Sequence, residues 1–290
     1  MLQHKYCKTL AKGSCQVLYF CCIQIFMKHK LLIGLSILFF ASCNDKPKTT
    51  PDTTAEPLQL SYTITATYPH NTESFTEGLE YRDGFLYEGT GDVEKIGKSK
   101  LAKIDLKTGK DLQKINLEPG YFGEGITLLN GKIYQMTWQE NKCFLYDAKT
   151  FTKLKEFSYE GEGWGLTNDG KQLIMSNGSC NLYFRDPETF AVTKTIAVND
   201  QFGPLPPQTI NELEYVDGFV YANIWQREKI VKIDLTTGKV VAEINFSDLL
   251  NKYPPQNKVD VLNGIAYDSV GKRFFITGKY YPQIFEVKLN

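Results

Sequence analysis

One pattern recurs five times along the chain, and it constrains the fold more than any other feature. Each copy is a strand-forming run, a turn that usually contains Asp-Gly or Asn-Gly, and a second strand-forming run, which together indicate a β-hairpin. The copies start at Glu77, Glu124, Trp164, Asn211 and Asn263. Their spacing of 40–52 residues is typical of the blades of a β-propeller.

A second strand–turn–strand unit follows most copies, for example at 101–110 and 231–239, so each repeat holds four strands. The last repeat ends at Asn290 before a full fourth strand. Leu58–Thr67 alternates between apolar and polar residues ahead of the first repeat and can supply the missing strand. We therefore predict an all-β domain over 58–290, a five-bladed β-propeller closed by an N-terminal strand and without a helical domain.

The start of the chain has the features of a secretion signal. Met27 opens a short basic stretch, the apolar run Leu31–Phe40 follows, and small residues precede Cys43. A run of about ten apolar residues is too short to span a bilayer as a helix. The residues Phe-Ala-Ser-Cys at 40–43 look like a bacterial lipobox, in which the cysteine is lipidated. We predict that 1–43 is an N-terminal extension plus a lipoprotein-type signal peptide, with Met27 as the true start.

The signal peptide and the lipobox-like residues predict a lipoprotein of the bacterial cell envelope, periplasmic or on the surface. The lipid on Cys43 would attach it to the membrane. Residues 44–57 are rich in proline, threonine and charge and lack a large apolar side chain, which predicts a disordered linker. Only Cys143 and Cys180 remain in the predicted propeller. The sequence leaves open whether these two thiols pair or stay free.

Charge and histidine content exclude several classes of function. Residues 1–43 carry five lysines and no acidic residue, so the rest of the chain has 28 basic against 33 acidic residues. That balance does not favour a nucleic-acid-binding surface. His70 is the only histidine after residue 43, which disfavours a three-histidine zinc site and a triad with a histidine base.

Alignment of the five copies predicts where a site would lie, because the innermost strands of a propeller line its central channel. The column at the start of the first strand holds Glu77, Glu124, Trp164, Asn211 and Asn263. The column at the far end of the hairpin holds Gly91, Trp138, Gly178, Trp225 and Lys279. All three tryptophans fall in these columns among polar side chains, which predicts a pocket for a small molecule or a peptide end. The alternative is that the aromatic residues are core and the polar ones are solvated loop ends.

Five motifs, one from each repeat, resemble those of the plant- and bacterial-type glutaminyl-peptide cyclotransferases, over nearly all of 60–290. They are Phe-Thr-Glu-Gly-Leu at 75–79, Phe-Gly-Glu-Gly-Ile at 122–126, Gly-Trp-Gly-Leu at 163–166, Asn-Glu-Leu-Glu at 211–214 and Asp-Val-Leu-Asn-Gly-Ile-Ala at 260–266. The resemblance implies a five-bladed propeller whose site lies at the channel mouth. It implies an acyltransferase that converts the N-terminal glutamine of peptides to pyroglutamate with release of ammonia. No cofactor is expected, and we expect a monomer.

The same resemblance assigns roles to residues of this chain. Glu124 matches the proton-transferring glutamate, and Trp138, Trp164 and Trp225 would wall the pocket. Asn211 and Lys279 would bind the substrate backbone or polarise its amide, and we place Asn263 in the substrate-binding set with them. Glu77 stands where the family commonly has glutamine. Two carboxylates facing one channel raise the pKa of one of them.

Two other functions fit parts of the pattern. Glu77, Glu124, Asn211 and Asn263 are four oxygen donors around a channel, a set that suits Ca²⁺ and a propeller hydrolase such as a lactonase. That hypothesis lacks an obvious histidine or aspartate base and does not explain the tryptophans. The third possibility is a non-catalytic envelope propeller that binds peptides.

Overall fold

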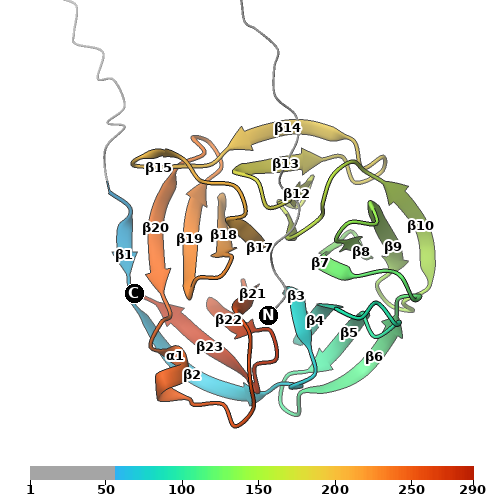
Figure 1. The fold of residues 1–290 in the computed structure, drawn as a ribbon, viewed down its shortest axis with the longest axis horizontal. Helices are drawn as coiled ribbons and strands as arrows, with labels where there is room; N and C mark the ends of the chain where they lie inside the picture. The colour runs from blue at the N-terminus through green and yellow to red at the C-terminus, as the bar shows by residue number, and fades with distance from the viewer. Residues whose placement is uncertain (1–55) are drawn as a thin grey trace, which may run out of the picture. The chain divides into compact units, whose positions relative to one another are not determined.

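The computed structural model describes residues 56–290, which form a ring of five β-sheets around a central axis (Figure 1). This confirms the predicted all-β, five-bladed propeller. The only α-helix among the described residues is one turn long, α1 (Leu249–Lys252). The predicted signal peptide, Cys43 and the linker up to residue 55 lie outside the described residues. No helix within 56–290 is long and apolar enough to cross a membrane.

Each blade is an antiparallel sheet that runs from the channel outwards. The innermost strands are β3 (Phe75–Arg82), β7 (Gly123–Leu129), β11 (Leu166–Asn168), β17 (Ile210–Val216) and β21 (Leu262–Asp268). The second strands are β4 (Phe85–Gly91), β8 (Lys132–Thr137), β12 (Leu173–Met175), β18 (Phe219–Ile224) and β22 (Arg273–Gly278). The predicted Asp-Gly and Asn-Gly turns join these pairs, as at Asp83-Gly84, where both residues have positive φ.

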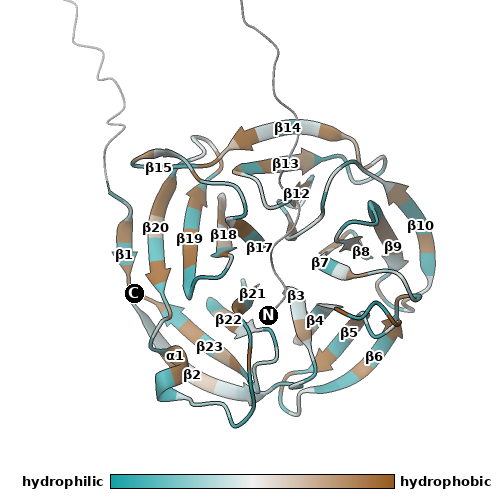
Figure 2. Ribbon diagram, in the orientation of Figure 1, coloured by the Kyte–Doolittle hydropathy of each residue, from teal (hydrophilic) through white to brown (hydrophobic). Residues whose placement is uncertain are grey.

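The two outer positions of each blade complete the four-stranded pattern. The third strands are β5 (Lys100–Asp105), β9 (Lys142–Asp147), β13 (Asn181–Arg185), β19 (Lys229–Asp234) and β23 (Gln283–Leu289). The fourth strands are β6 (Lys110–Asn116), β10 (Lys153–Ser158), β14 (Val192–Ala197), β20 (Val240–Asn245) and β2 (Tyr62–Pro69). Along the outer strands hydrophobic and hydrophilic residues follow one another, because one face meets the core and the other meets solvent (Figure 2). The hairpin of β15 (Asn199–Asp200) and β16 (Gly203–Pro204) follows the third blade.

The N-terminal segment closes the ring, but not as one strand. β2 pairs antiparallel with β23, from Tyr62 opposite Leu289 to Pro69 opposite Gln283, which confirms the predicted closure. The expectation that Leu58 belongs to the same strand is wrong, since β1 (Leu58–Leu60) pairs in parallel with β20 of the fourth blade. Tyr62 marks the change of blade: its ring lies 4.4 Å from that of Phe246 and its hydroxyl donates to Asp248 at 2.5 Å.

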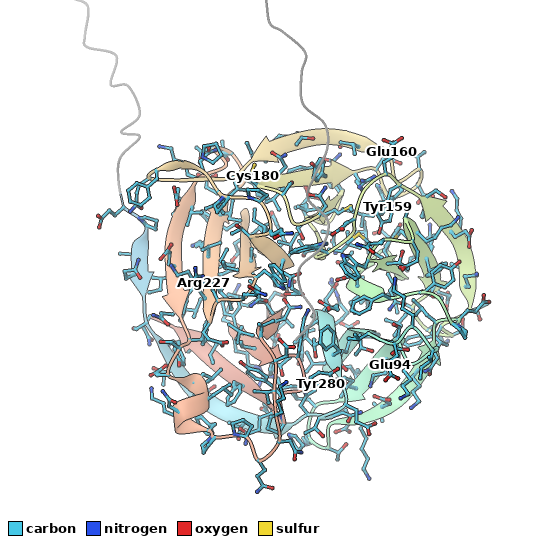
Figure 3. The ribbon with its side chains drawn as sticks, viewed as in Figure 1. Glu94, Tyr159, Glu160, Cys180, Arg227 and Tyr280 are labelled. Carbon is cyan, nitrogen blue, oxygen red and sulfur yellow. The ribbon has the colours of Figure 1, made fainter. Side chains whose placement is uncertain are left out.

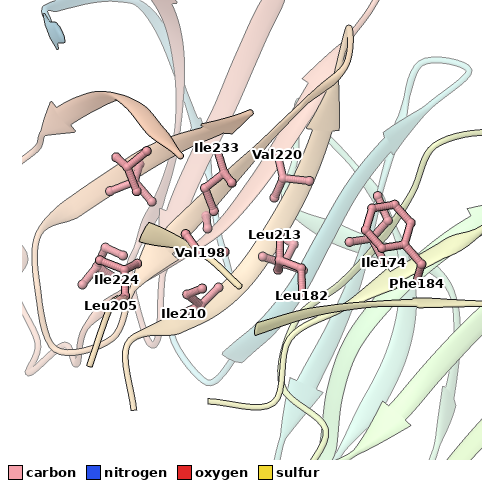
Figure 4. Close-up of a cluster of buried hydrophobic side chains, with 13 residues drawn as sticks. Ile174, Leu182, Phe184, Val198, Leu205, Ile210, Leu213, Val220, Ile224 and Ile233 are labelled. Carbon is pink, nitrogen blue, oxygen red and sulfur yellow. The ribbon is translucent and has the colours of Figure 1, made fainter. Parts of the chain in front are cut away.

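The hydrophobic core lies between neighbouring blades, in five clusters. In the cluster between the third and fourth blades, Ile174 and Phe184 of one sheet pack against Leu213 and Val220 of the next (Figure 4). Such face-to-face burial stabilises the ring, at about 25 cal/mol per Å² of apolar surface. Of the two cysteines within 56–290, Cys143 is buried in the cluster between the second and third blades and Cys180 is partly exposed, and both are free thiols.

A layer of close backbone contacts crosses the channel just beyond the first column. Glycine stands there in four blades: Gly78, Gly125 and Gly264 within the inner strands and Gly165 directly before β11. A Cβ atom on Gly78 would lie 2.5 Å from the nitrogen of Ile126, so the neighbouring strands leave no room for a side chain. The fourth blade has Glu212 instead, whose two oxygens accept N–H groups of Leu79 and Ile265 at 3.2 and 2.8 Å. This layer lies between the first column and the opposite ends of the inner strands.

Candidate active site

β-Bulges aim the first-column side chains into the channel mouth. In β3, Thr76 pairs with Thr90 and Gly78 with Gly89, so Glu77 is the extra residue of a bulge. The registers of β7, β17 and β21 shift in the same way at Glu124, Asn211 and Asn263. Since a bulge breaks the alternation of side chains, it allows consecutive repeats to direct polar groups to one place. Trp164 lies two residues before β11 and completes the column.

These side chains surround a cavity of about 350 Å³ at this mouth. Seven of the eight predicted pocket residues line it: Glu77, Glu124, Trp138, Trp164, Asn211, Trp225 and Lys279. The eighth, Asn263, is fully buried and does not line the cavity. Its side-chain Nδ2 donates to Glu77 Oε2 at 3.1 Å and to the Thr76 carbonyl at 2.9 Å. Asn263 is therefore a hydrogen-bond partner of Glu77 and is not part of the cavity wall.

Aromatic rings form the walls. The rings of Trp164 and Trp225 meet edge to face with centroids 5.6 Å apart, and Phe122 meets Trp138 at the same separation. Phe75 packs against Phe122 at 5.9 Å. The column alignment missed Phe75 and Phe122, although each stands two residues before a column glutamate in a repeated Phe-x-Glu-Gly motif. Phe75 and Phe122 line the cavity together with these glutamates.

Glu77 and Lys279 form a buried ion pair in the cavity wall, with Lys279 Nζ 2.6 Å from Glu77 Oε1. The Lys279 ammonium also lies 4.3 Å from the ring centroid of Phe75. Burial raises the pKa of Glu77 from 4.5 to about 7; Lys279 acts in the opposite direction and Asp260 in the same one. Glu77 is thus held by two partners, Lys279 and Asn263.

The surroundings of Glu124 differ from those of Glu77. It is 5% exposed, and its Oε2 is the only carboxylate oxygen within 56–290 that is buried without a hydrogen-bond partner. Burial raises the pKa of Glu124 well above its usual range, and the negative charge of Glu77 raises it further. Lys279 lowers this pKa, while Glu162 and Glu140 raise it. Buried polar atoms are rarely left unpaired, so a cavity-lining residue with a free acceptor is a candidate for binding a ligand.

The sequence interpretation also missed Glu162, which lies behind two of the tryptophans. Its Oε2 accepts the indole N–H of both Trp138 and Trp164, each at 2.9 Å. Gln139 donates to the other oxygen at 3.0 Å.

The opposite end of the channel holds a larger cavity, of about 570 Å³. Its buried carboxylates, Glu80, Glu214 and Asp268, all accept hydrogen bonds. Glu80 accepts hydrogen bonds from Thr127, Leu128 and Arg82 at 2.6–2.8 Å, and Asp268 accepts from Val270, Gly271 and Arg273 at 2.9–3.0 Å. None of the predicted site residues lines this cavity.

Two contacts argue against calcium at the donor set of Glu77, Glu124, Asn211 and Asn263. Asn263 turns its NH₂ group towards Glu77, and the ammonium of Lys279 lies 2.6 Å from the same carboxylate. A cation at this place would lie beside a fixed positive charge, which disfavours Ca²⁺. Within 56–290 no three His, Cys, Asp or Glu side chains are grouped to hold a metal ion.

Known proteins are similar to this chain over most of its length. The family model described as glutamine cyclotransferase matches residues 35–289. A glutaminyl-peptide cyclotransferase of Arabidopsis thaliana is 37% identical over 269 residues, which cover 90% of this chain and 81% of the plant protein. The crystal structure of Myxococcus xanthus glutaminyl cyclase matches with a TM-score of 0.74 and 34% identity, covering 81% of this chain and 99% of that one. These matches confirm the resemblance inferred from the five motifs.

Proposed function

Because the chain belongs to the glutamine cyclotransferase family, we propose that it is an acyltransferase that cyclises the N-terminal glutamine of peptides and proteins to pyroglutamate. The α-amine attacks the γ-carboxamide of the same residue, so no protein nucleophile is needed. The enzyme has to fold back a flexible side chain, accept the proton of the attacking amine, stabilise the oxyanion and protonate the leaving nitrogen. The cavity offers a group for each task.

Glu124 carries the proton, and the observation that carries this assignment is that Glu124 lines the cavity and keeps a buried Oε2 without a hydrogen-bond partner. The α-amine nitrogen forms the new bond to the amide carbon and passes its excess proton to Glu124. Glu124 then returns the proton to the amide nitrogen, the carbon–nitrogen bond breaks, and ammonia leaves. A carboxyl group whose pKa is raised towards that of an amine exchanges a proton with it at little cost.

Lys279 and Asn211 stabilise the developing oxyanion or hold the substrate backbone. Both line the cavity, and Ser176 fixes the Asn211 main chain by donating to its carbonyl at 2.7 Å. Because Glu77 holds Lys279 in place, the ammonium is oriented before substrate arrives. The three tryptophans enclose the folded glutamine side chain and exclude water, which strengthens these polar contacts.

The remaining parts of the proposal concern the setting of the enzyme. No cofactor takes part, since the reaction is an internal acyl transfer whose proton steps one carboxyl group can serve. The protein works as a monomer and reaches the cell envelope through lipidation of Cys43, as the lipobox-like residues 40–43 suggest. In this proposal residues 1–43 serve delivery and residues 44–57 tether the propeller to the lipid.

One assay separates this function from its alternatives. A glutaminyl dipeptide is incubated with the protein with and without a divalent-metal chelator, and released ammonia and the pyroglutamyl product are measured. We expect equal ammonia release in both. Loss of activity with chelator would favour the calcium-dependent hydrolase, and no ammonia in either would favour a non-catalytic peptide-binding propeller.

A further inference from the structure

We propose that Glu162 is a positioning residue for cyclisation, which fixes two walls of the pocket by holding the indoles of Trp138 and Trp164 on one carboxylate. This inference rests on the proposed function and adds a residue to it. We call the three side chains Trp138, Glu162 and Trp164 the Glu162 bridge.

The bridge joins two different blades. Trp138 follows β8 of the second blade, and Trp164 precedes β11 of the third. Both indole N–H groups reach the same oxygen, Oε2 of Glu162, at 2.9 Å. Hydrogen bonds to a charged acceptor are stronger than neutral ones and restrict ring orientation as well as position. One side chain thus sets the separation of two aromatic walls.

The main chain delivers Glu162 to this place. Gly163 donates its N–H to the Trp138 carbonyl at 2.9 Å, and Trp164 donates to the Ser176 carbonyl at 3.1 Å. A Cβ atom on Gly163 would lie 2.2 Å from the Tyr159 hydroxyl, so the chain packs closely against the second blade. The loop that carries Glu162 is therefore tied to both blades whose tryptophans it holds.

Without the bridge, packing alone would orient the two rings. Trp138 would keep its edge-to-face contact with Phe122, and Trp164 its contact with Trp225. Buried indole N–H groups need an acceptor, and within 56–290 Glu162 is the side chain that provides it for both. Reorientation of either ring would loosen the enclosure of a glutamine side chain.

The charge of Glu162 gives the proposal a second measurable consequence, an effect on the pKa of Glu124. Burial alone would raise the pKa of Glu162, but the hydrogen bonds from Gln139, Trp164 and Trp138 outweigh it and lower the pKa. Glu162 is therefore an anion at neutral pH, and its charge contributes to the raised pKa of Glu124. Removal of that charge lowers the pKa of Glu124, whose other charged neighbours are Glu77, Lys279 and Glu140.

The test compares Glu162→Ala and Glu162→Gln in the whole chain. In Glu162→Ala both indoles lose their acceptor, and we expect KM for a glutaminyl dipeptide to rise about tenfold or more with a smaller change in kcat. The amide oxygen of Glu162→Gln can still accept both N–H groups, so KM should stay within about threefold of wild type. The limb of its pH–rate profile that Glu124 governs should move to lower pH.

Glu160→Gln is the matched control, because Glu160 is exposed near the outer edge of the ring (Figure 3). It should match wild type in KM and in pH profile. Tryptophan fluorescence gives a readout independent of turnover: the emission should change in Glu162→Ala and be restored in Glu162→Gln. Unchanged KM and emission in Glu162→Ala, or equal impairment of Glu162→Gln, would overturn the proposal. Absence of ammonia release by wild type would refute the proposed function instead, while the fluorescence comparison would still test the bridge.

Discussion

The cavities at the two ends of the channel differ in their lining and in the hydrogen bonding of their buried carboxylates. The cavity at the end lined by Glu80 and Glu214 is larger, about 570 Å³ against 350 Å³. Its buried carboxylates are bonded to backbone and side-chain donors, whereas Glu124 at the smaller cavity has a buried oxygen with no partner. Aromatic rings wall the smaller cavity. An unsatisfied acceptor among apolar walls, and not cavity size, is what distinguishes the candidate site.

Glu212 and Glu124 sharpen this comparison. Both are buried, and in both burial is the largest cause of a pKa raised well above the usual range. Glu212 nevertheless accepts two backbone N–H groups in the layer that crosses the channel. A perturbed pKa alone therefore does not identify a catalytic residue, since structural carboxylates share it.

The largest effect we predict is on kcat of Glu124→Gln. Glutamine keeps the shape of the side chain but cannot take up and return a proton. Loss of general acid–base catalysis typically costs about 10²–10⁴-fold, and we expect the upper part of that range because one group serves both proton steps. Ammonia release at saturating substrate measures it. Glu214→Gln, at the opposite end, should keep kcat within about threefold, since its amide oxygen can still accept the N–H of Tyr267. Equal losses in the two variants would contradict the assignment.

The next effect is on stability and concerns Glu212→Ala. The change leaves the buried N–H groups of Leu79 and Ile265 without their acceptor. Each unsatisfied donor costs about 1–3 kcal/mol, so we expect a loss of at least about 2 kcal/mol. For a domain of this size that lowers Tm by several degrees, roughly 2–4 °C per kcal/mol. Thermal unfolding checks it, and a Tm equal to wild type would show that the layer does not hold the ring together.

A smaller effect is expected on substrate binding in Trp164→Phe. The variant loses part of the packing surface and the bond to Glu162 but leaves the proton path in place, so KM should rise several-fold, on the order of 3–10, with kcat nearly unchanged. Trp138→Phe should behave alike. Tyr267→Phe at the opposite cavity is the control and should leave KM unchanged. Steady-state kinetics with a glutaminyl dipeptide decide; a KM rise in Tyr267→Phe as large as in Trp164→Phe would remove the distinction between the two ends.

The smallest effect is a change in pH dependence in Glu77→Gln. The pKa of Glu77 is 4.5 in the unfolded chain and about 7 in the folded one. At a pH between these two values, Glu77 is therefore protonated in the folded chain and ionised in the unfolded chain. This group therefore makes stability fall as pH rises through that window. Glu77→Gln should flatten the fall and keep kcat within about threefold, with the limb governed by Glu124 moved to lower pH. Denaturant unfolding from pH 4 to pH 8 measures the slope, with exposed Glu73→Gln as the control; an unchanged slope would argue against a raised pKa at Glu77.

The fold was predictable because its signals are local. Turns such as Asp83-Gly84 and the alternation along each strand are written in a few consecutive residues, and their repetition fixed the number of blades. The N-terminal closure was predicted as well, but not the exchange at Tyr62, where Leu58–Leu60 joins a different blade. That exchange depends on contacts of Tyr62 with Phe246 and Asp248, which are distant in sequence.

The sequence predicts those cavity residues that occupy matching positions in the repeats. It does not predict residues whose role depends on contacts between blades. Seven predicted residues line the cavity, and bulges at matching places in the repeats hold three of them, Glu77, Glu124 and Asn211. Glu162 was missed because its role appears only when two blades bring two indoles to one carboxylate. Asn263 was predicted to bind substrate, whereas its side chain bonds to Glu77. Hydrogen bonding between blades leaves no periodic trace in the sequence.

The most direct test of the central claim is the position of a bound substrate. A crystal structure of Glu124→Gln with a glutaminyl peptide would trap the unreacted complex. We predict the glutamine residue inside the cavity walled by Trp138, Trp164 and Trp225, with its α-amino nitrogen within about 3.2 Å of residue 124, directly or through one water. A peptide bound at the opposite end of the channel, or one whose amine and amide both lie beyond reach of residue 124, would contradict the claim.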